Sequence, residues 1–127
     1  MDNPGMQTLD AITPVATVED IVAIQKTIKK IKVEETIAGY MVEIVSRTRA
    51  HPSLKLGISP RGAMMLFRTS QAYAFIHDRD FVIPDDVKDL LVSVCAHRII
   101  LDTKSKYAGV RKQDILQEIL QEIPVPI

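Results

Sequence analysis

The sequence has few of the residues on which disulfides, metal centres and membrane spans depend. Its 127 residues include one cysteine, three histidines and no tryptophan. A single cysteine excludes an internal disulfide, and Cys95 lies in an apolar run where a small buried side chain is expected. No apolar run approaches the roughly 20 residues of a transmembrane helix, and the first residues lack the basic and apolar blocks of a signal peptide. These absences predict a soluble, cytoplasmic protein.

An excess of positive charge is also absent. The chain has 16 lysines and arginines against 16 aspartates and glutamates. It therefore carries no bulk positive field of the kind that supports nonspecific binding of nucleic acids. A basic edge does occur on the first predicted helix, without interleaved aromatic residues, which is typical of solvated lysines. Its members are Lys26, Lys29, Lys30 and Lys32.

Motifs for catalysis and metal binding are missing as well. The sequence contains no phosphate loop, no G-x-S-x-G, no C-x-x-C and no H-E-x-x-H. His51, His77 and His97 lie on separate segments with no carboxylate or cysteine at metal-ligand spacing, so no metal ligand is assigned. Asp85 and Asp86 are interpreted as helix-capping residues and not as an acid–base pair. By itself, the chain is not expected to be an enzyme.

What is present is helical periodicity, which covers most of the chain after residue 16. The first predicted helix begins at a capping pair formed by Thr17 and Asp20. Its inward stripe is predicted to consist of Val18, Ile21, Ile24, Ile28 and Ile31. The second helix ends near "TRAHP", because proline disfavours helical geometry in the residue before it. Its inward residues are predicted to be Ile37, Tyr40, Met41, Ile44 and Val45.

The segment "HPSLKLGI" is predicted to be a loop in which Gly57 adopts a positive φ. Ser59 and Pro60 are the preferred residue types for the N-cap and first position of a third helix, which we expect over residues 60–77. This helix is apolar on more than one face, so it should be central. Its core-facing residues are predicted to include Leu66 and Phe67.

The last third of the chain predicts two more helices. A short extended piece near Phe81–Ile83 precedes a helix that begins at Pro84. Its buried stripe is predicted to be Val87, Leu90, Leu91 and Val94. A polar connection containing Gly109 leads to a final helix over residues 112–123. Its inward residues are predicted to be Ile115, Leu116, Ile119, Leu120 and Ile123. The sum is an all-α bundle of four or five helices, with residues 1–16 as an extended arm or linker and residues 17–127 as the folded domain.

Several short motifs occur in an order that resembles one known family. They are "TRAHP" followed by "LGISPR", then "DRDFVIPDDV", then "HRI", and finally "EIPVPI". Together they resemble the carboxy-terminal lid subdomain of the MoxR-like AAA+ ATPases, over about residue 9 to the end of the chain. Gly62 stands where the family usually has alanine, and Ile83 where it often has a threonine that would cap the next helix.

The resemblance implies a small helical lid that follows a larger α/β subdomain and closes over the ATP and magnesium held there. No tight nucleotide binding is expected from this chain alone. Arg61 of "SPR" would be the sensor-2 residue, which acts in catalysis only with that subdomain and contacts the γ-phosphate, and Gly57, Ser59 and Pro60 would be nucleotide-binding. An arginine in a first helical turn gains nothing from the helix dipole, whereas phosphate offers it two charge-assisted hydrogen bonds. The alternative is an arginine that pairs with a nearby carboxylate of the chain.

The resemblance also implies partners. They would be the chain's own ATPase core, neighbouring subunits of a hexameric ring and client proteins that undergo chaperone-like remodelling, with no nucleic acid and no membrane. Two other classes stay open. A free-standing helical adaptor would bind a partner through an exposed groove, and a histone-fold-like DNA-associated module would also place a short strand before a helix. A phosphate-loop sequence upstream in the same reading frame would favour the lid, and a stop codon would favour the adaptor.

Overall fold

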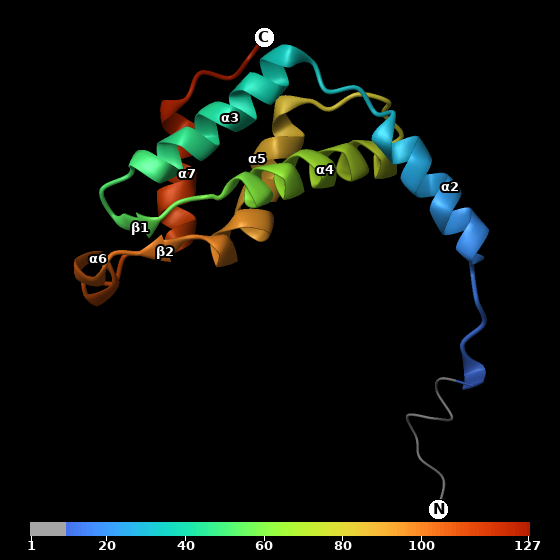
Figure 1. Cartoon of the computed structure of the whole chain (residues 1–127), viewed down its shortest axis with the longest axis horizontal. Coiled ribbons are helices and arrows are strands. Elements are labelled where there is room, and N and C mark those ends of the chain that lie inside the picture. Colours follow the sequence, from blue (N-terminus) through green and yellow to red (C-terminus); the bar gives the residue numbers. More distant parts are fainter. Residues whose placement is uncertain (1–9) are drawn as a thin grey trace, which may run out of the picture.

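The computed structural model describes residues 10–127 (Figure 1). In chain order the elements are α2 (Val18–Lys29), α3 (Glu35–Ala50), β1 (Leu54–Leu56), α4 (Pro60–Ile76), α5 (Pro84–Cys95), the 3-10 helix η1 (Ala96–Arg98), β2 (Ile100–Leu101), α6 (Thr103–Tyr107) and α7 (Lys112–Glu122). The all-α prediction is confirmed, since helices dominate the described residues. None of these helices has the length and apolar character that a membrane span requires. The predicted arm lies largely outside the described residues, and residues 10–16 are exposed.

Four helices enclose the core. Helix α4 packs on α5 and α3, and α7 closes the bundle by packing on α3 and α5 (Figure 1). Most of the predicted inward residues of α3, α5 and α7 are buried, which confirms their helical stripes. The buried ones are Ile37, Tyr40, Met41, Ile44, Val87, Leu91, Ile115, Leu116, Ile119, Leu120 and Ile123. Val45, Leu90 and Val94 are half-buried against them.

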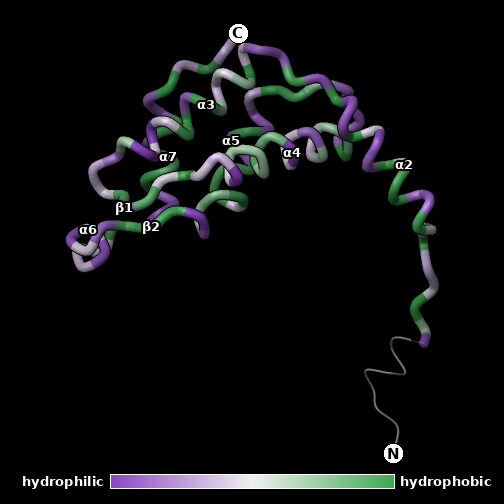
Figure 2. Tube along the Cα trace, in the orientation of Figure 1, coloured by the Kyte–Doolittle hydropathy of each residue, from purple (hydrophilic) through white to green (hydrophobic). Residues whose placement is uncertain are grey.

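Helix α2 differs from its prediction. None of its residues is buried, and Val18, Ile21 and Ile24 are 76%, 48% and 38% exposed. Only Ile31, beyond the end of the helix, enters the core. The physical reason is that α2 lies at the edge of the bundle, where α4 is its main packing partner. Figure 2 shows apolar residues along α2 as along the enclosed helices, but here the bundle does not cover them.

Two predicted helix starts are confirmed. Thr17 Oγ1 accepts a hydrogen bond from the backbone N–H of Asp20 at 3.1 Å, and the Asp20 carboxylate accepts one from the N–H of Thr17 at 2.9 Å. This reciprocal pair is a capping box. Ser59 Oγ accepts from the N–H of Gly62 at 3.1 Å, with Pro60 in the first helical position. Both starts depend on residues within one turn of each other.

The start of α5 depends on Asp86. Its carboxylate is almost fully buried and accepts a hydrogen bond from the N–H of Ile83 at 3.0 Å. This confirms the capping interpretation for Asp86, while Asp85 is exposed in the same turn. The carboxylate also accepts two hydrogen bonds from the Arg79 guanidinium. That ion pair, which ties the α4–α5 connection to α5, was not predicted.

The prediction of a loop over "HPSLKLGI" is wrong, and the predicted polar connection after α5 contains a second strand. Strand β1 pairs antiparallel with β2, with Leu54 opposite Leu101 and Leu56 opposite Ile100. Helix α6 lies within the same predicted connection. Strands of two or three residues are too short to show an alternating pattern, and their partners are distant in sequence. The predicted extended piece at Phe81–Ile83 contributes a single bridge, from Phe81 to Lys32.

The prediction for Gly57 is also wrong. Among the described residues, the glycine with positive φ is Gly109, at 80°. Gly57 is required for a different reason, because an added Cβ would lie 2.7 Å from the Cα of Arg49 at the end of α3. The chain therefore passes closer to α3 here than any other residue type allows.

Helix α4 is less enclosed than its composition predicts. Leu66 is fully buried, as expected, but Phe67 is only half-buried. Met64, Met65 and Ile76 are 49%, 40% and 70% exposed. Helices α3 and α5 cover one side of α4 and α2 covers part of another, so the remaining side is open.

Candidate functional site

Arg61 lies in the first turn of α4 and is exposed. Within residues 10–127 its guanidinium makes no ion pair and no hydrogen bond. The alternative of a carboxylate partner for Arg61 in the chain therefore finds no support in the described part. The backbone N–H of Arg61 also lacks a partner within the helix, as is usual for a first turn. The helix start thus offers donors and positive potential together.

A shallow pocket of about 290 Å³ lies beside this helix start. It is lined by Arg49, Lys55, Leu56, Gly57, Ile58, Ser59 and Pro60. The structure therefore brings Gly57, Ser59 and Pro60 together in one pocket, immediately before Arg61. It adds Arg49 and Lys55, which the sequence analysis missed because they come from the end of α3 and from β1.

Arg98 supplies a further cation at the same helix start. Its Cδ would lie 3.3 Å from a Cβ placed on Gly62, so its side chain runs along the first turn of α4. The Nε of Arg98 is buried and has no hydrogen-bond partner in the described structure. A buried donor without a partner calls for an explanation such as an absent ligand. The motif "HRI" is the sequence signal that points to Arg98.

The packing around Gly62 also accounts for this departure from the family pattern. A Cβ at this position would approach Ile58 Cγ2 to 2.9 Å as well as the Arg98 side chain. Glycine therefore leaves room for Arg98 to lie against α4. Two cationic side chains, Arg49 and Lys55, line the pocket before this helix start, and no carboxylate is among the lining residues. Arg61 belongs to the helix start itself, and Arg98 lies beside Gly62. Such a site suits an anion with several oxygen atoms.

The remaining chemistry-bearing residues form no catalytic cluster. Burial raises the pKa of the Cys95 thiol to about 11, so Cys95 is a neutral core residue at ordinary pH. Hydrogen bonds from Ser105 hold the pKa of the Asp102 carboxyl below its usual value, as expected for the N-cap of α6. No group of three or more histidine, cysteine, aspartate or glutamate side chains within residues 10–127 could hold a metal ion. His51 Nε2 lies 3.8 Å from Glu118 Oε2. His51 follows α3 and Glu118 lies on α7, so neither residue belongs to the helix that carries Arg61.

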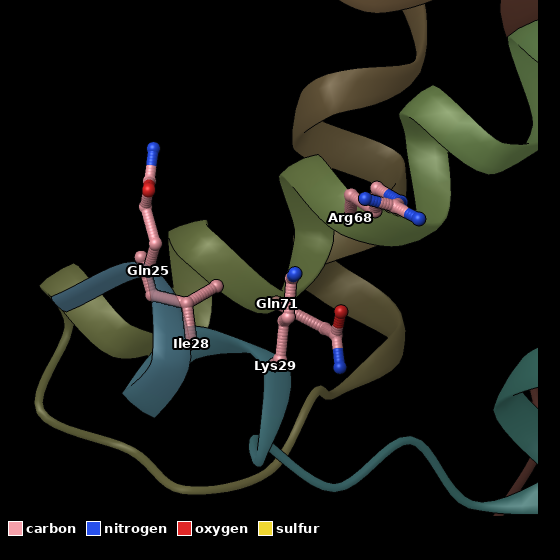
Figure 3. Close-up of a pocket in the computed structure, with 5 residues that line it drawn as sticks. All are labelled: Gln25, Ile28, Lys29, Arg68 and Gln71. Carbon is pink, nitrogen blue, oxygen red and sulfur yellow. The ribbon is translucent and has the colours of Figure 1, made fainter. Parts of the chain in front are cut away.

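A second hollow lies between α2 and α4 (Figure 3). It has a volume of about 290 Å³ and is lined by Gln25, Ile28, Lys29, Arg68 and Gln71. Gln71 donates a hydrogen bond from Nε2 to the carbonyl of Ile31 at 2.9 Å, which ties the end of α2 to α4. No carboxylate, hydroxyl or thiol side chain is among the residues that line this hollow.

Comparisons with known proteins agree with this architecture. The AAA lid domain family matches residues 46–119. The protein YeaC of Bacillus subtilis is 39% identical over 119 residues, which cover 94% of this chain and 37% of YeaC. The chaperone MoxR1 of Mycobacterium tuberculosis is 24% identical over 116 residues, covering 84% of this chain and 31% of MoxR1. The crystal structure of a "putative ATPase" from Cytophaga hutchinsonii superimposes with a TM-score of 0.81 and 30% identity, covering 86% of this chain and 36% of that one.

The chain belongs to the AAA lid domain family, and within it to the lids of MoxR-like AAA+ ATPases. It spans about a third of the length of the curated relatives that it matches over most of its own length.

Proposed function

We propose that this chain is the lid that closes over ATP bound by the core of its parent ATPase, with Arg61 as the sensor-2 residue. The observation that carries this proposal is the exposed Arg61, which makes no ion pair among residues 10–127 and directly follows a pocket lined by Arg49 and Lys55. Like charges gathered without a carboxylate repel each other, and a phosphate would relieve that repulsion. A guanidinium meets phosphate oxygens through two parallel hydrogen bonds, which makes arginine the suitable residue.

In the proposed cycle, the γ-phosphate of ATP draws Arg61 toward the core and closes the lid. Magnesium bound with ATP in the core would supply positive charge to the phosphates. Arg98, whose side chain lies beside Gly62, adds positive charge at the same helix start. Because the α4 start belongs to the packed bundle, movement of Arg61 carries α3, α5 and α7 with it as one body. Loss of the γ-phosphate then releases the lid.

The exposed apolar side of α2 supports a lid that rests on another domain. Val18, Ile21, Val22 and Ile24 are all more than a third exposed on one short helix. Apolar residues gathered in this way mark an interaction surface more often than a solvent-facing one. We assign this surface to the ATPase core.

The wider activity follows by analogy with the relatives. MoxR1 is named as a chaperone, which supports a role for the parent protein in remodelling or maturing client proteins. Repeated lid closure around a ring of subunits, a hexamer in our proposal, would convert hydrolysis into movement of a client. Such a machine would work in the cytoplasm.

The test is ATP hydrolysis by the full-length parent with substitutions in the lid. Arg61→Ala should lower kcat by about two orders of magnitude, as for other groups that stabilise transferred phosphate. Arg61→Lys should restore little of this loss, because lysine lacks the planar fork. Arg111→Ala, which removes another exposed arginine, is the matched control and should leave the rate unchanged. A rate and nucleotide affinity that Arg61→Ala leaves intact would overturn the proposal.

A further inference from the structure

A third pocket, on the other side of β1, has a different character. It has a volume of about 310 Å³ and is lined by Lys55, Ile100, Leu101, Thr103, Lys106 and Lys112. We call it the lysine pocket. Its three lysines come from β1, α6 and the first residue of α7, and the pairing of β1 with β2 brings these segments together. They therefore converge through the fold and not through a run of basic residues in the sequence.

The lysines of this pocket have no counter-charge. None of the three makes an ion pair within the described residues, and no carboxylate is among the lining residues. Two acidic residues are close in the chain: Asp102, which caps α6 by accepting from the N–H of Ser105 at 2.8 Å, and Asp114, two residues after Lys112. Neither lines the pocket, so the lining residues carry three positive charges and no negative one.

The floor of the pocket is apolar. Ile100 is 49% exposed and Leu101 is half-buried, and Leu56, opposite Ile100 in the sheet, is 52% exposed. Both strands are also edge strands, because the sheet has only two strands among the described residues. An open strand edge beside apolar side chains is a common place for a peptide to bind. Lysines around the pocket would then favour a peptide with negatively charged side chains.

We infer that the lysine pocket docks an acidic peptide segment of another protein, with carboxylates on the lysines and an apolar side chain on Ile100 and Leu101. A peptide fits better than a nucleic acid for two reasons. No aromatic side chain lines the pocket to stack on a base. Its cations are all lysines, which lack the fork that makes arginine the better phosphate binder. This site is distinct from the nucleotide role of Arg61, although Lys55 borders both pockets.

The experiment titrates the chain against a fluorescent peptide of alternating glutamate and leucine, followed by anisotropy. A second peptide with glutamine in place of glutamate is the ligand control. The pocket variant combines Lys106→Glu with Lys112→Glu and leaves Lys55 intact. The matched variant combines Lys26→Glu on α2 with Lys30→Glu at its C-cap, which makes the same change of charge at two exposed lysines. Circular dichroism checks that both variants keep the helical fold.

We expect the acidic peptide to bind at least about tenfold more tightly than the glutamine peptide, and the pocket variant to lose about tenfold in affinity. The α2 variant should stay within about twofold of the parent chain. Absence of acidic-peptide binding, equal binding of the glutamine peptide or an equal loss in the α2 variant would each overturn the inference. Stronger competition by a single-stranded oligonucleotide than by unlabelled peptide would assign the pocket to nucleic acid instead. None of these readouts involves ATP, so failure here leaves the proposed role of Arg61 unaffected.

Discussion

Helices α2 and α7 are nearly the same length, 12 and 11 residues, and both carry apolar residues at helical spacing. Helix α7 buries four residues, whereas α2 buries none. The difference lies in what surrounds them, because α7 packs between α3 and α5 while α2 meets mainly α4. An apolar stripe predicts that a helix needs a covering surface, but it does not say whether that surface is in the same chain. We interpret α7 as the core of the lid and α2 as its contact with the ATPase core.

The largest expected effect is at the centre of the enclosed region. Leu116 on α7 is fully buried, so Leu116→Ala removes apolar contacts and leaves a cavity. We expect a loss of about 4 kcal/mol in the free energy of unfolding, measured by urea denaturation of the isolated chain. A loss below about 1 kcal/mol would show that α7 is not enclosed as described.

The ion pair at the start of α5 should come next. Asp86→Ala leaves the Arg79 guanidinium and the N–H of Ile83 without their acceptor. We expect a loss of about 2–3 kcal/mol, less than for a fully buried pair because Arg79 is partly exposed. Asp85→Ala, in the same turn, is the matched control and should cost far less. Equal losses in the free energy of unfolding for the two substitutions would show that Asp86 does not stabilise the start of α5.

Phe67 on α4 should show an intermediate effect. It is half-buried against the core and lines a hollow with Lys29 of α2. Phe67→Ala should therefore cost about 2 kcal/mol, below the 3–5 kcal/mol typical of a fully buried phenylalanine. A cost in that higher range would indicate that α2 covers α4 more closely than the structure shows.

The smallest effect is expected on α2 itself. Ile21→Ser replaces an apolar side chain that is 48% exposed. In the isolated chain the free energy of unfolding should change by no more than about 0.5 kcal/mol, as is usual for an exposed position. A loss of about 2 kcal/mol in urea denaturation would mean that α2 is part of the bundle core, and the contrast with α7 would disappear.

Local sequence signals predicted the helices well. The capping box at Thr17 and the Ser59–Pro60 start each depend on residues within one turn, so the sequence shows them directly. The pairing of β1 with β2 could not be predicted in this way. It joins short segments more than 40 residues apart, Leu54 with Leu101, and neither is long enough to show a period of two. Which helices pack over each apolar stripe is likewise decided by the assembled fold and not by the local sequence.

The candidate site likewise combines residues that a local motif indicates with residues that come from distant segments. Gly57, Ser59, Pro60 and Arg61 are contiguous, so a motif could point to all of them at once. Arg49, Lys55 and Arg98 reach the same place from α3, β1 and η1. Their convergence depends on the course of the chain between these elements, which no local pattern describes.

We propose that the ATPase core covers the exposed apolar residues of α2, and one labelling experiment tests this contact most directly. Ile21→Cys introduces an exposed thiol, while the native Cys95 is fully buried and its thiol pKa is raised. Maleimide labelling of the introduced thiol is followed by mass spectrometry of its peptide, in the isolated chain and in the full-length parent ATPase. We expect rapid labelling in the isolated chain and at least about tenfold slower labelling in the parent, because burial limits access to a thiol. Equal labelling rates in the two proteins would contradict the account.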